Sequence, residues 1–494
     1  MRDDVESSSC YVTQMDSKTT ERNQHLRLYL LCLFCLCGLT SCLYYGDIHG
    51  HSKPLSVSDL TKKHVYKTTA PTQHANERRR FNDPELRELI AIALKDSPDM
   101  EIAKARVRRA DALVSGATSQ LFPSIDFSGY VQRQKFAEFG LVPPPFNGRT
   151  FNIGELGFNF NYDFDFWGKH RQILAARLGE KCAALADLAH ARLIISAAVA
   201  NTYFHLLNEI AQKKIASENV SLVRQISTIV DYRASHGIES DIPVKTALAN
   251  AESARLSVEK IKQAEMLYRN RLAILLGKNP FNTEIITHHF VYRPPQVSLP
   301  VPLTANLLAH RPDIQATKQR MQAAAHQINA AKARFFPDIN LMGLFSYQSV
   351  GLGHLFDVGS QNNAITGAVD LPIFDAGARR ANLSEKYAEY DLAVNHYNQT
   401  ILKALHEVAD QLTIIKSVSS QQRVQHLALK ATAHHYKLIH SRYNHGIIDY
   451  VEVLESKQLL LKQQALSLNL ETEHLQAVVG LLKALGENEM SQQG

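Results

Sequence analysis

The chain has 494 residues, of which 45% are hydrophobic and 21% charged, and its formal net charge is +6. This weak charge, without a Lys/Arg block interleaved with aromatic residues, excludes a nucleic-acid partner. Of the six cysteines only Cys182 lies beyond residue 42, so no intramolecular disulfide can form in the mature body, which must be held by packing and assembly.

The first residues have the pattern of a bacterial export signal. Arg27 precedes a 13-residue apolar run, Leu28 to Thr40, which has the length of a signal-peptide core and is too short to span a bilayer as a helix. The next residues complete the tetrapeptide Leu39-Thr40-Ser41-Cys42. It resembles a lipobox, in which a cysteine becomes the lipidated first residue of the mature protein.

We therefore predict a lipoprotein signal peptide over residues 1–41, with the true start at Met1 or Met15, and lipid attachment at Cys42. A lipidated N-terminal extension follows over residues 42–82, polar and extended. The alternative is an ordinary signal peptide in which Cys42 is a buried thiol.

The rest of the chain is an internal repeat. Residues that shape the backbone recur 214 positions later as far as Pro123, and 209 positions later from Gly168 onward. The five-residue difference between these spacings falls where a surface loop can absorb it. The recurring pairs include Pro98-Asp99 with Pro312-Asp313, Phe122-Pro123 with Phe336-Pro337, Gly168 with Gly377, Arg233 with Arg442, His236-Gly237-Ile238 with His445-Gly446-Ile447, and Leu276-Gly277 with Leu485-Gly486.

Such repetition predicts one object made of two similar halves. We expect the units to cover residues 83–277 and 303–487, followed by a C-terminal tail over 488–494. Five prolines between residues 278 and 302 indicate an extended connector.

Each unit opens with a helical segment between two prolines, at 98–123 and 312–337, and then changes to strand periodicity. The clearest alternation places Leu156, Phe158, Phe160, Tyr162, Phe164 and Phe166 on one face of a strand and Gly157, Asn159, Asn161, Asp163 and Asp165 on the other. Its length and aromatic content suit a membrane-spanning strand. With weaker alternations from Ile125, from Ile339 to Tyr347 and from Ile365 to Ile373, we predict four strands per chain.

Beyond the strands, two proline-free segments, 169–236 and 378–445, predict helices on the order of 100 Å long. Each is followed by a turn at Gly237 or Gly446 and a helix of about 34 residues. We expect this last helix and the opening helix to stack end to end beside the long helix. The predicted fold class is mainly α, a long helical tunnel with four transmembrane β-strands per chain and an internal tandem repeat.

Four strands cannot close a membrane barrel, because the smallest barrels use about eight and open edges in lipid leave backbone groups unpaired. The chain is therefore expected to oligomerise around a shared tube.

Three stretches carry a family resemblance: Leu307-Leu308-Ala309-His310-Arg311-Pro312-Asp313-Ile314, Asp165-Phe166-Trp167-Gly168-Lys169 and Pro372-Ile373-Phe374-Asp375-Ala376-Gly377. They resemble signature motifs of the TolC-like outer-membrane factors, in the NodT/OprM-like lipoprotein branch, and the resemblance covers roughly residues 80–487. It implies a homotrimer with a 12-stranded outer-membrane barrel and a periplasmic helical tunnel. It also implies an exit duct for tripartite efflux or for type I secretion, joined through a periplasmic adaptor to an inner-membrane pump, with no catalysis and no cofactor.

The resemblance also implies a periplasmic gate. Glu452 and Glu455 match positions whose carboxylates ring the closed aperture, and their spacing places both on one helix face. The alternative is a pair of solvated helix glutamates. Tyr443 matches a tyrosine that bonds to an aspartate of the neighbouring hairpin, but Pro243 occupies that aspartate position here, and Asp241 is the candidate substitute.

Catalytic and metal chemistry find little support. Adjacent histidines such as His434-His435 point about 100° apart on a helix and cannot chelate one ion together. Glu471 and His474 form a lone Glu-x-x-His without the second motif that a di-metal bundle needs. We predict no enzyme and no metal site. Two further alternatives are a structural trimeric stalk or adhesin, and a passive porin, which has many more strands and short periplasmic turns.

Overall fold

The computed structural model describes residues 48–56, 83–281 and 310–486. It falls into two compact units, each containing parts of both repeats. The first unit comprises residues 1–53, 110–181 and 320–395, and the second comprises residues 54–109, 182–319 and 396–494.

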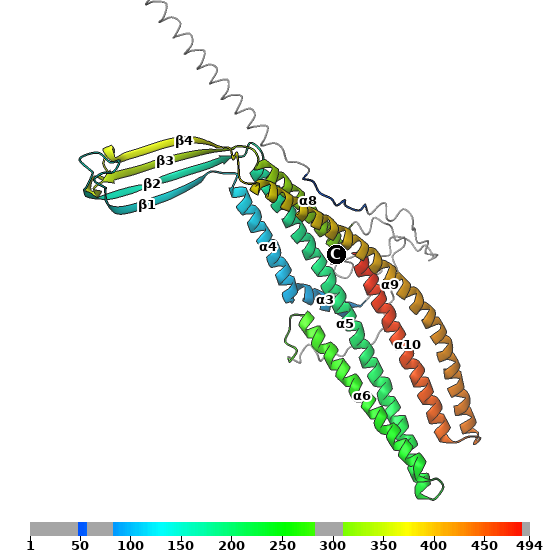
Figure 1. Ribbon diagram of the computed structural model, residues 1–494. Helices are drawn as coiled ribbons and strands as arrows, with labels where there is room; N and C mark the ends of the chain where they lie inside the picture. Colours follow the sequence, from blue (N-terminus) through cyan, green and yellow to red (C-terminus); the bar gives the residue numbers. More distant parts are fainter. Residues whose placement is uncertain (1–47, 57–82, 282–309, 487–494) are drawn as a thin grey trace, which may run out of the picture. The chain divides into compact units, whose positions relative to one another are not determined.

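The described chain is built from long helices and four strands (Figure 1). In chain order these are α3 Pro84–Asp96, α4 Pro98–Ser119, β1 Ser124–Lys135, β2 Thr150–Phe164, α5 Lys169–Ser235, α6 Asp241–Leu275, α8 Pro312–Ala333, β3 Asp338–Val350, β4 Gln361–Asp370, α9 Ala378–Asn444 and α10 Tyr450–Leu485. The four predicted strands and the two long helices are confirmed, and α5 and α9 are 67 residues each.

The strands belong to the first unit and form one antiparallel sheet in the order β1-β2-β3-β4. Each repeat contributes one hairpin. The β2–β3 ladder joins the two hairpins and runs from Ile153 opposite Val350 to Phe164 opposite Ile339. The outer edges of β1 and β4 pair with no other strand in the described part of the chain.

The predicted ends of two strands are wrong. β2 stops at Phe164 and not at Phe166, because the Asp165 carboxylate accepts hydrogen bonds from the backbone N–H groups of His170 and Arg171 at 3.0 and 2.9 Å. The Asp165 side chain therefore caps the first turn of α5, and the residue does not continue the strand ladder. β4 ends at Asp370, before Pro372, which has no N–H to donate to a ladder.

The opening helices also end earlier than predicted, at Ser119 and Ala333. Steric clash with a proline ring disfavours the helical conformation in the residue before it, so Phe122 and its counterpart lie outside the helix. Helix α3 was not predicted. Its signal is Asp83 before Pro84, since the Asp83 carboxylate accepts hydrogen bonds from the N–H groups of Glu85 and Leu86.

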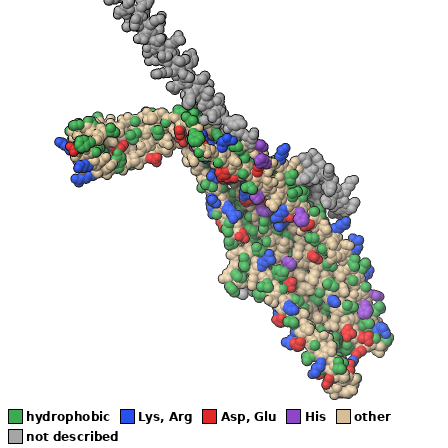
Figure 2. All heavy atoms as spheres, in the orientation of Figure 1, with side chains coloured by type: hydrophobic (Ala, Val, Ile, Leu, Met, Phe, Trp, Pro, Cys, Tyr) green, Lys and Arg blue, Asp and Glu red, His purple; other side chains and the backbone are tan. Residues whose placement is uncertain are grey.

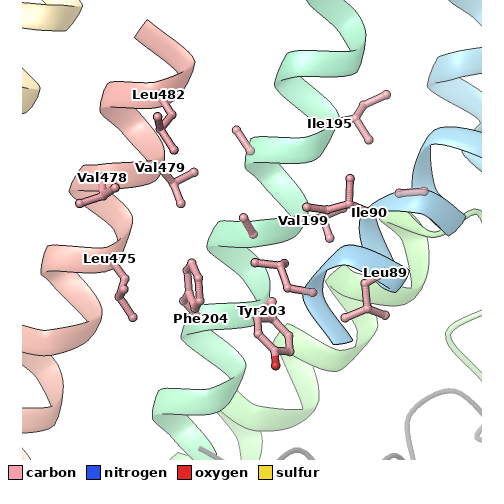
Figure 3. Close-up of a cluster of buried hydrophobic side chains, with 14 of the residues drawn as sticks. Leu89, Ile90, Ile195, Val199, Tyr203, Phe204, Leu475, Val478, Val479 and Leu482 are labelled. Atoms are coloured by element: carbon pink, nitrogen blue, oxygen red, sulfur yellow. The ribbon is translucent and has the colours of Figure 1, made fainter. Parts of the chain in front are cut away.

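A cluster of buried side chains joins α3, α5 and α10 in the second unit (Figure 3). Each fully buried Leu, Ile or Phe of this kind contributes about 1.5–3 kcal/mol relative to its exposed state. An apolar window of α5 also meets the length and composition of a membrane span, and 33% of that window is buried. Some of the apolar character of α5 therefore serves this core. The labelled members are Leu89, Ile90, Ile195, Val199, Tyr203, Phe204, Leu475, Val478, Val479 and Leu482.

Two glycines let helices meet end to end in the second unit. Gly277, just after α6, has φ +70° and lies against the α3–α4 junction, where an added Cβ would stand 2.3 Å from the Asp96 carbonyl oxygen. Gly486 follows α10 with φ +76°, and its Cβ would stand 2.9 Å from Arg311 Cγ, beside the start of α8. Both positions need a residue without a side chain. They confirm the expected stacking of the shorter helices.

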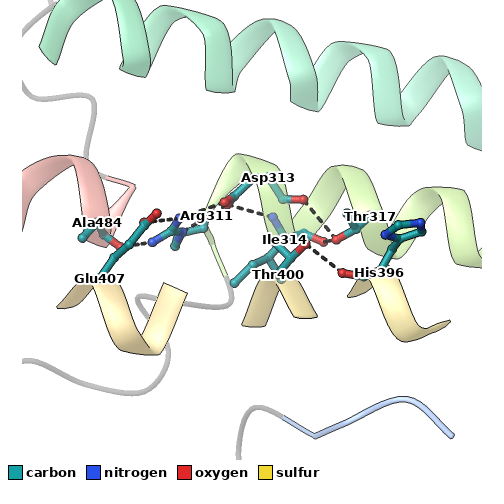
Figure 4. A network of polar contacts seen from close by, with 8 residues as sticks. All are labelled: Arg311, Asp313, Ile314, Thr317, His396, Thr400, Glu407 and Ala484. Carbon is teal, nitrogen blue, oxygen red and sulfur yellow. Dashed lines mark hydrogen bonds and ion pairs between the residues drawn. The ribbon is translucent and has the colours of Figure 1, made fainter. Parts of the chain in front are cut away.

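The second junction contains a buried ion cluster (Figure 4). The Arg311 guanidinium, 5% exposed, donates from Nε and Nη2 to the Asp313 carboxylate at 3.1 and 2.8 Å. Nη2 also donates to Glu407 of α9 at 3.0 Å, and Nη1 donates to the Ala484 carbonyl of α10 at 2.6 Å. Burial raises the pKa of Asp313, but the bonds and charge of Arg311, the charge of His190 and the Ile314 N–H together lower it by more, so its pKa is below the ordinary value. Arg311 thus joins the start of α8 to α9 and α10.

Residues 48–56 lie along α9 without helix or strand. In the first unit the Asp391 carboxylate accepts hydrogen bonds from His51 N at 2.9 Å and Ser52 N at 2.8 Å, and Ile48 packs against the cluster that contains Phe335. In the second unit Leu55 N donates to Asn398 at 2.7 Å. We call residues 48–55 the N-terminal strap.

Candidate functional sites: the two-faced sheet and the helix tips

The sheet has one apolar and one polar face. In the register Phe127, Phe158 and Phe345 lie in one row, and each is more than half exposed. Ile125 and Ile365 continue the same face and are 67% and 73% exposed. A row of exposed aromatic and aliphatic side chains on a water-facing sheet would be unfavourable, so this face requires an apolar environment.

The opposite face carries the carboxylates of the strands. Asp126, Glu155, Asp163, Asp338 and Asp370 all have the parity of this face in the strand register. Asn159, on the same face, donates to Ser128 Oγ at 2.7 Å. The sheet therefore has one apolar face and one polar face, as the alternation predicts.

Aromatic rings gather at both ends of the sheet. At the end next to the helices, Trp167 stacks on Phe336 with ring centroids 4.5 Å apart, and its indole N–H donates to the Pro337 carbonyl at 2.9 Å. At the loop end, Phe146 and Phe151 are in edge contact at 5.5 Å. Aromatic rings at the ends of the strands are typical of a membrane-spanning sheet.

At the tips of the helical hairpins, the second unit contains an ion pair that sequence reasoning missed. Arg233, near the end of α5, is paired with the carboxylate of Asp449, the N-cap of α10. Burial raises the pKa of Asp449, but the bond and charge of Arg233 and the backbone N–H groups of Val451 and Tyr450 together lower it by more, so the net pKa is below the ordinary value. The pair joins the hairpin of the first repeat to that of the second.

The predicted gate residues belong to the second unit and lie within six residues of Asp449 in the sequence. Glu452 and Glu455 are exposed on the first turns of α10. Tyr443 does not bond to Asp241 within the described chain; its ring contacts Tyr450 at 5.0 Å. Pro243 fits the first turn of α6, which begins at Asp241.

The remaining sequence predictions concern lipid attachment and metal binding. Cys42 lies outside the described residues. Over the part of the chain that is described, no group of three His, Cys, Asp or Glu side chains is placed to hold a metal ion.

Comparison with known proteins assigns the family. The sequence model of the family described as "Outer membrane efflux protein" matches residues 89–278 and 303–487. The chain belongs to the outer membrane efflux protein family. Multidrug resistance outer membrane protein MdtQ of Escherichia coli O157:H7 is 31% identical to it over 422 residues, which are 82% of this chain and 86% of MdtQ.

Solved structures of outer membrane proteins have the same fold. The outer membrane protein VceC of Vibrio cholerae is 32% identical and superposes with a TM-score of 0.74 over 82% of this chain and 97% of VceC. The CmeC outer membrane channel of Campylobacter jejuni, 24% identical, superposes with a TM-score of 0.78 over 89% of this chain and 95% of CmeC. As a member of the outer membrane efflux protein family, the chain is an outer-membrane channel for efflux, in a family of channels and not of enzymes.

Proposed function

We propose that this chain forms the homotrimeric exit duct of a tripartite efflux system, with three four-stranded sheets closing one 12-stranded barrel. The observation that carries the proposal is the two-faced sheet, whose apolar face suits lipid and whose carboxylate face suits a water-filled lumen. Both faces belong to a sheet with too few strands to close alone.

The free strand edges support three copies. Backbone N–H and C=O groups on the outer sides of β1 and β4 need partners in lipid, and pairing β1 of one copy with β4 of the next satisfies both edges at once. A cyclic arrangement of identical copies closes without leaving an edge.

Exposed apolar side chains on the helices support the same assembly. They lie on α6 and α9, where nothing in the described chain covers them, and burying them between copies removes them from water. On α6 they are Ile242, Leu248, Leu256, Met266, Leu267 and Ile274, and on α9 they are Leu392, Leu402, Val424, Leu427 and Leu438.

The duct's partners in this proposal are a periplasmic adaptor and an inner-membrane pump, and its cargo is small molecules, in line with the multidrug-resistance names of its relatives. An open groove of about 630 Å³ in the second unit, with both apolar and polar lining, is a candidate contact surface for the adaptor. It is lined by Ser217, Val220, Ser221, Arg224, Gln225, Thr228 and Ile229 of α5 and by Tyr450 of α10.

The function is tested by deleting the gene in its own host and measuring ethidium accumulation and drug susceptibility. We expect the deletion to raise accumulation and the wild-type gene to reverse it. Mild crosslinking of the complemented strain should capture the adaptor and the pump. Unchanged accumulation together with the loss of a secreted protein would instead indicate type I secretion.

Lipid attachment at Cys42 is a proposal that the N-terminal strap supports. Ile48 packs beside Phe335, three residues before β3 starts at Asp338, so the chain leaves the strap near the base of the sheet. Cys42→Ser should abolish fatty-acid labelling, while the strands still hold the trimer in the membrane. A variant that keeps its label would remove the lipoprotein assignment.

Glu452 and Glu455 are proposed to form a ring of six carboxylates at the periplasmic end of the trimer. Several carboxylates in a narrow pore focus a negative potential, so a trivalent cation added to the periplasmic side should block current through single channels. Changing both to glutamine should weaken that block by about tenfold and leave trimer assembly intact.

The matched control is Glu473→Gln, an exposed glutamate elsewhere on α10, which should leave block unchanged. Tyr443→Phe is expected to raise conductance, because it removes the hydroxyl that is proposed to bond to the neighbouring hairpin in the trimer, whereas removing charge alone raises it only modestly. If the double glutamine variant is blocked as strongly as the wild type, the charge of the constriction resides elsewhere, with Asp449 and Asp241 as the next candidates.

A further inference from the structure

The charges of the four strands are separated by face. All five strand carboxylates lie on the polar face, whereas both strand cations, Arg133 and Lys135, have the parity of the apolar face. Neither β3 nor β4 contains a Lys or Arg. The two cations thus share their face with no strand carboxylate, and charge pairing within the sheet does not explain them.

The two cations lie where the apolar band ends. Along β1 the apolar face runs through Ile125, Phe127 and Val131 and then reaches Arg133 and Lys135. At about 3.4 Å per residue, the band from Ile125 to Val131 spans about 20 Å along the strand. The cations follow it at the loop end, opposite Asn152 and Thr150 of β2.

The neighbouring turn adds a third cation. The Arg149 carbonyl accepts a hydrogen bond from Phe136 N at 3.0 Å, so Arg149 lies one step beyond Lys135 in the hairpin. Arg133, Lys135 and Arg149 are exposed, and none forms an ion pair within the described structure. Glu138, the one carboxylate of residues 136–149, is also exposed and bonds to none of them. Figure 2 shows Lys and Arg side chains, coloured blue, at the free end of the sheet.

We propose that Arg133 and Lys135, helped by Arg149, bind the phosphate groups of phosphorylated lipids in the leaflet at the loop end of the sheet. The inference rests on the proposed function, because it needs the apolar face to contact lipid. A ligand that fits has acyl chains beside Ile125, Phe127 and Val131 and an anionic headgroup one step further along the strand. A phosphorylated lipid has both parts, and a soluble phosphate has only one.

The electrostatics favour such a contact. A cation near an anionic lipid surface contributes about fivefold to binding, which is about 1 kcal/mol, and a cation at the membrane interface costs little, unlike one at the bilayer centre. Three copies of the chain would place nine cations around the barrel rim.

The test compares purified full-length wild type with Arg133→Gln/Lys135→Gln, each reconstituted into phosphatidylcholine vesicles containing diphosphorylated lipid A. Lipid that stays bound after gentle detergent extraction is measured by mass spectrometry. We expect wild type to enrich lipid A over phosphatidylcholine, and the double variant to lose about 25-fold of that enrichment, about fivefold for each cation. Lys403→Gln/Lys416→Gln, which removes two exposed cations from α9, should keep it.

Enrichment that survives in the Arg133/Lys135 variant, or is lost equally in the α9 control, would overturn the proposal. So would full competition by inorganic phosphate at matched ionic strength, since that outcome assigns the site to a soluble anion. Flotation and channel conductance of the same vesicles separate the two proposals. Wild type that neither inserts nor conducts contradicts the proposed function, whereas wild type that conducts without enriching lipid A contradicts this inference alone.

Discussion

Replacing Arg311 with alanine is expected to destabilise the protein by about 3–5 kcal/mol, because the change leaves Asp313 and Glu407 without their counter-charge in a buried site. The loss of the bond to the Ala484 carbonyl also frees the end of α10. The measurement is the thermal unfolding of the purified protein in detergent, followed by circular dichroism, together with the yield of trimer.

The repeat supplies a matched control for this experiment. Asp99 occupies in the first copy the position of Asp313 in the second, but it is exposed and makes no ion pair within the described chain. Asp313→Ala should therefore destabilise strongly, whereas Asp99→Ala should change stability by less than about 0.5 kcal/mol. Arg311→Lys should restore only part of the loss, since an ammonium cannot reproduce the two-pronged bond to Asp313. Equal effects at Asp99 and Asp313 would contradict the assignment.

The same cluster predicts a dependence on pH. The pKa of Asp313 is lowered in the folded protein, so its contribution to stability is complete above the ordinary carboxyl pKa and is lost as the pH falls through the lower, folded-state value. The difference in stability between wild type and Asp313→Ala should therefore shrink in acid.

Arginine at Phe160 is expected to reduce the yield of membrane-inserted trimer severely. Phe160 pairs with Ile125 and Gly343 in the middle of the apolar face, and an arginine near the centre of a bilayer costs about 2–4 kcal/mol on a lipid-facing strand. A cost of that size corresponds to a population ratio of about 30-fold or more. The measurement is the amount of heat-resistant trimer in outer-membrane fractions.

Asn159 is the matched control, because it is the adjacent residue on the same strand and has the opposite parity. Asn159→Arg loses one exposed hydrogen bond to Ser128 and places the new charge on the carboxylate face, so near-normal yield is expected. If both positions tolerate arginine equally, the alternation is unrelated to lipid and the two-faced reading of the sheet is wrong.

The sequence predicts the architecture well where a feature repeats or has a clear period. Period-two alternation identified the strands, and the absence of proline identified α5 and α9, because both signals depend on many residues at once. Element ends were predicted less well. Single side chains determine them, such as the Asp165 carboxylate that starts α5 and the proline at 372 that ends β4.

Contacts between residues far apart in the chain were the part that sequence could not reveal. Arg311 and Glu407, or Arg233 and Asp449, are far apart in the chain, and only the folded helices bring them together. The same holds for the charge separation on the sheet. The strand register determines which face Arg133 and Lys135 share, and the register is set by pairing between strands. Glu452, Glu455 and Cys42 stay predictions.

The N-terminal strap limits how far a lipid anchor on Cys42 can lie from the folded chain. Ile48 is fixed beside Phe335, and the backbone at His51 is held by Asp391. Only five residues lie between Cys42 and Ile48, and the six residue steps from one to the other reach about 20 Å in a fully extended chain. An acyl group on Cys42 would thus fix the position of the periplasmic surface of the outer membrane to within about 20 Å of Ile48. Lengthening the tether by inserting residues between positions 42 and 48 would release this constraint without touching the barrel.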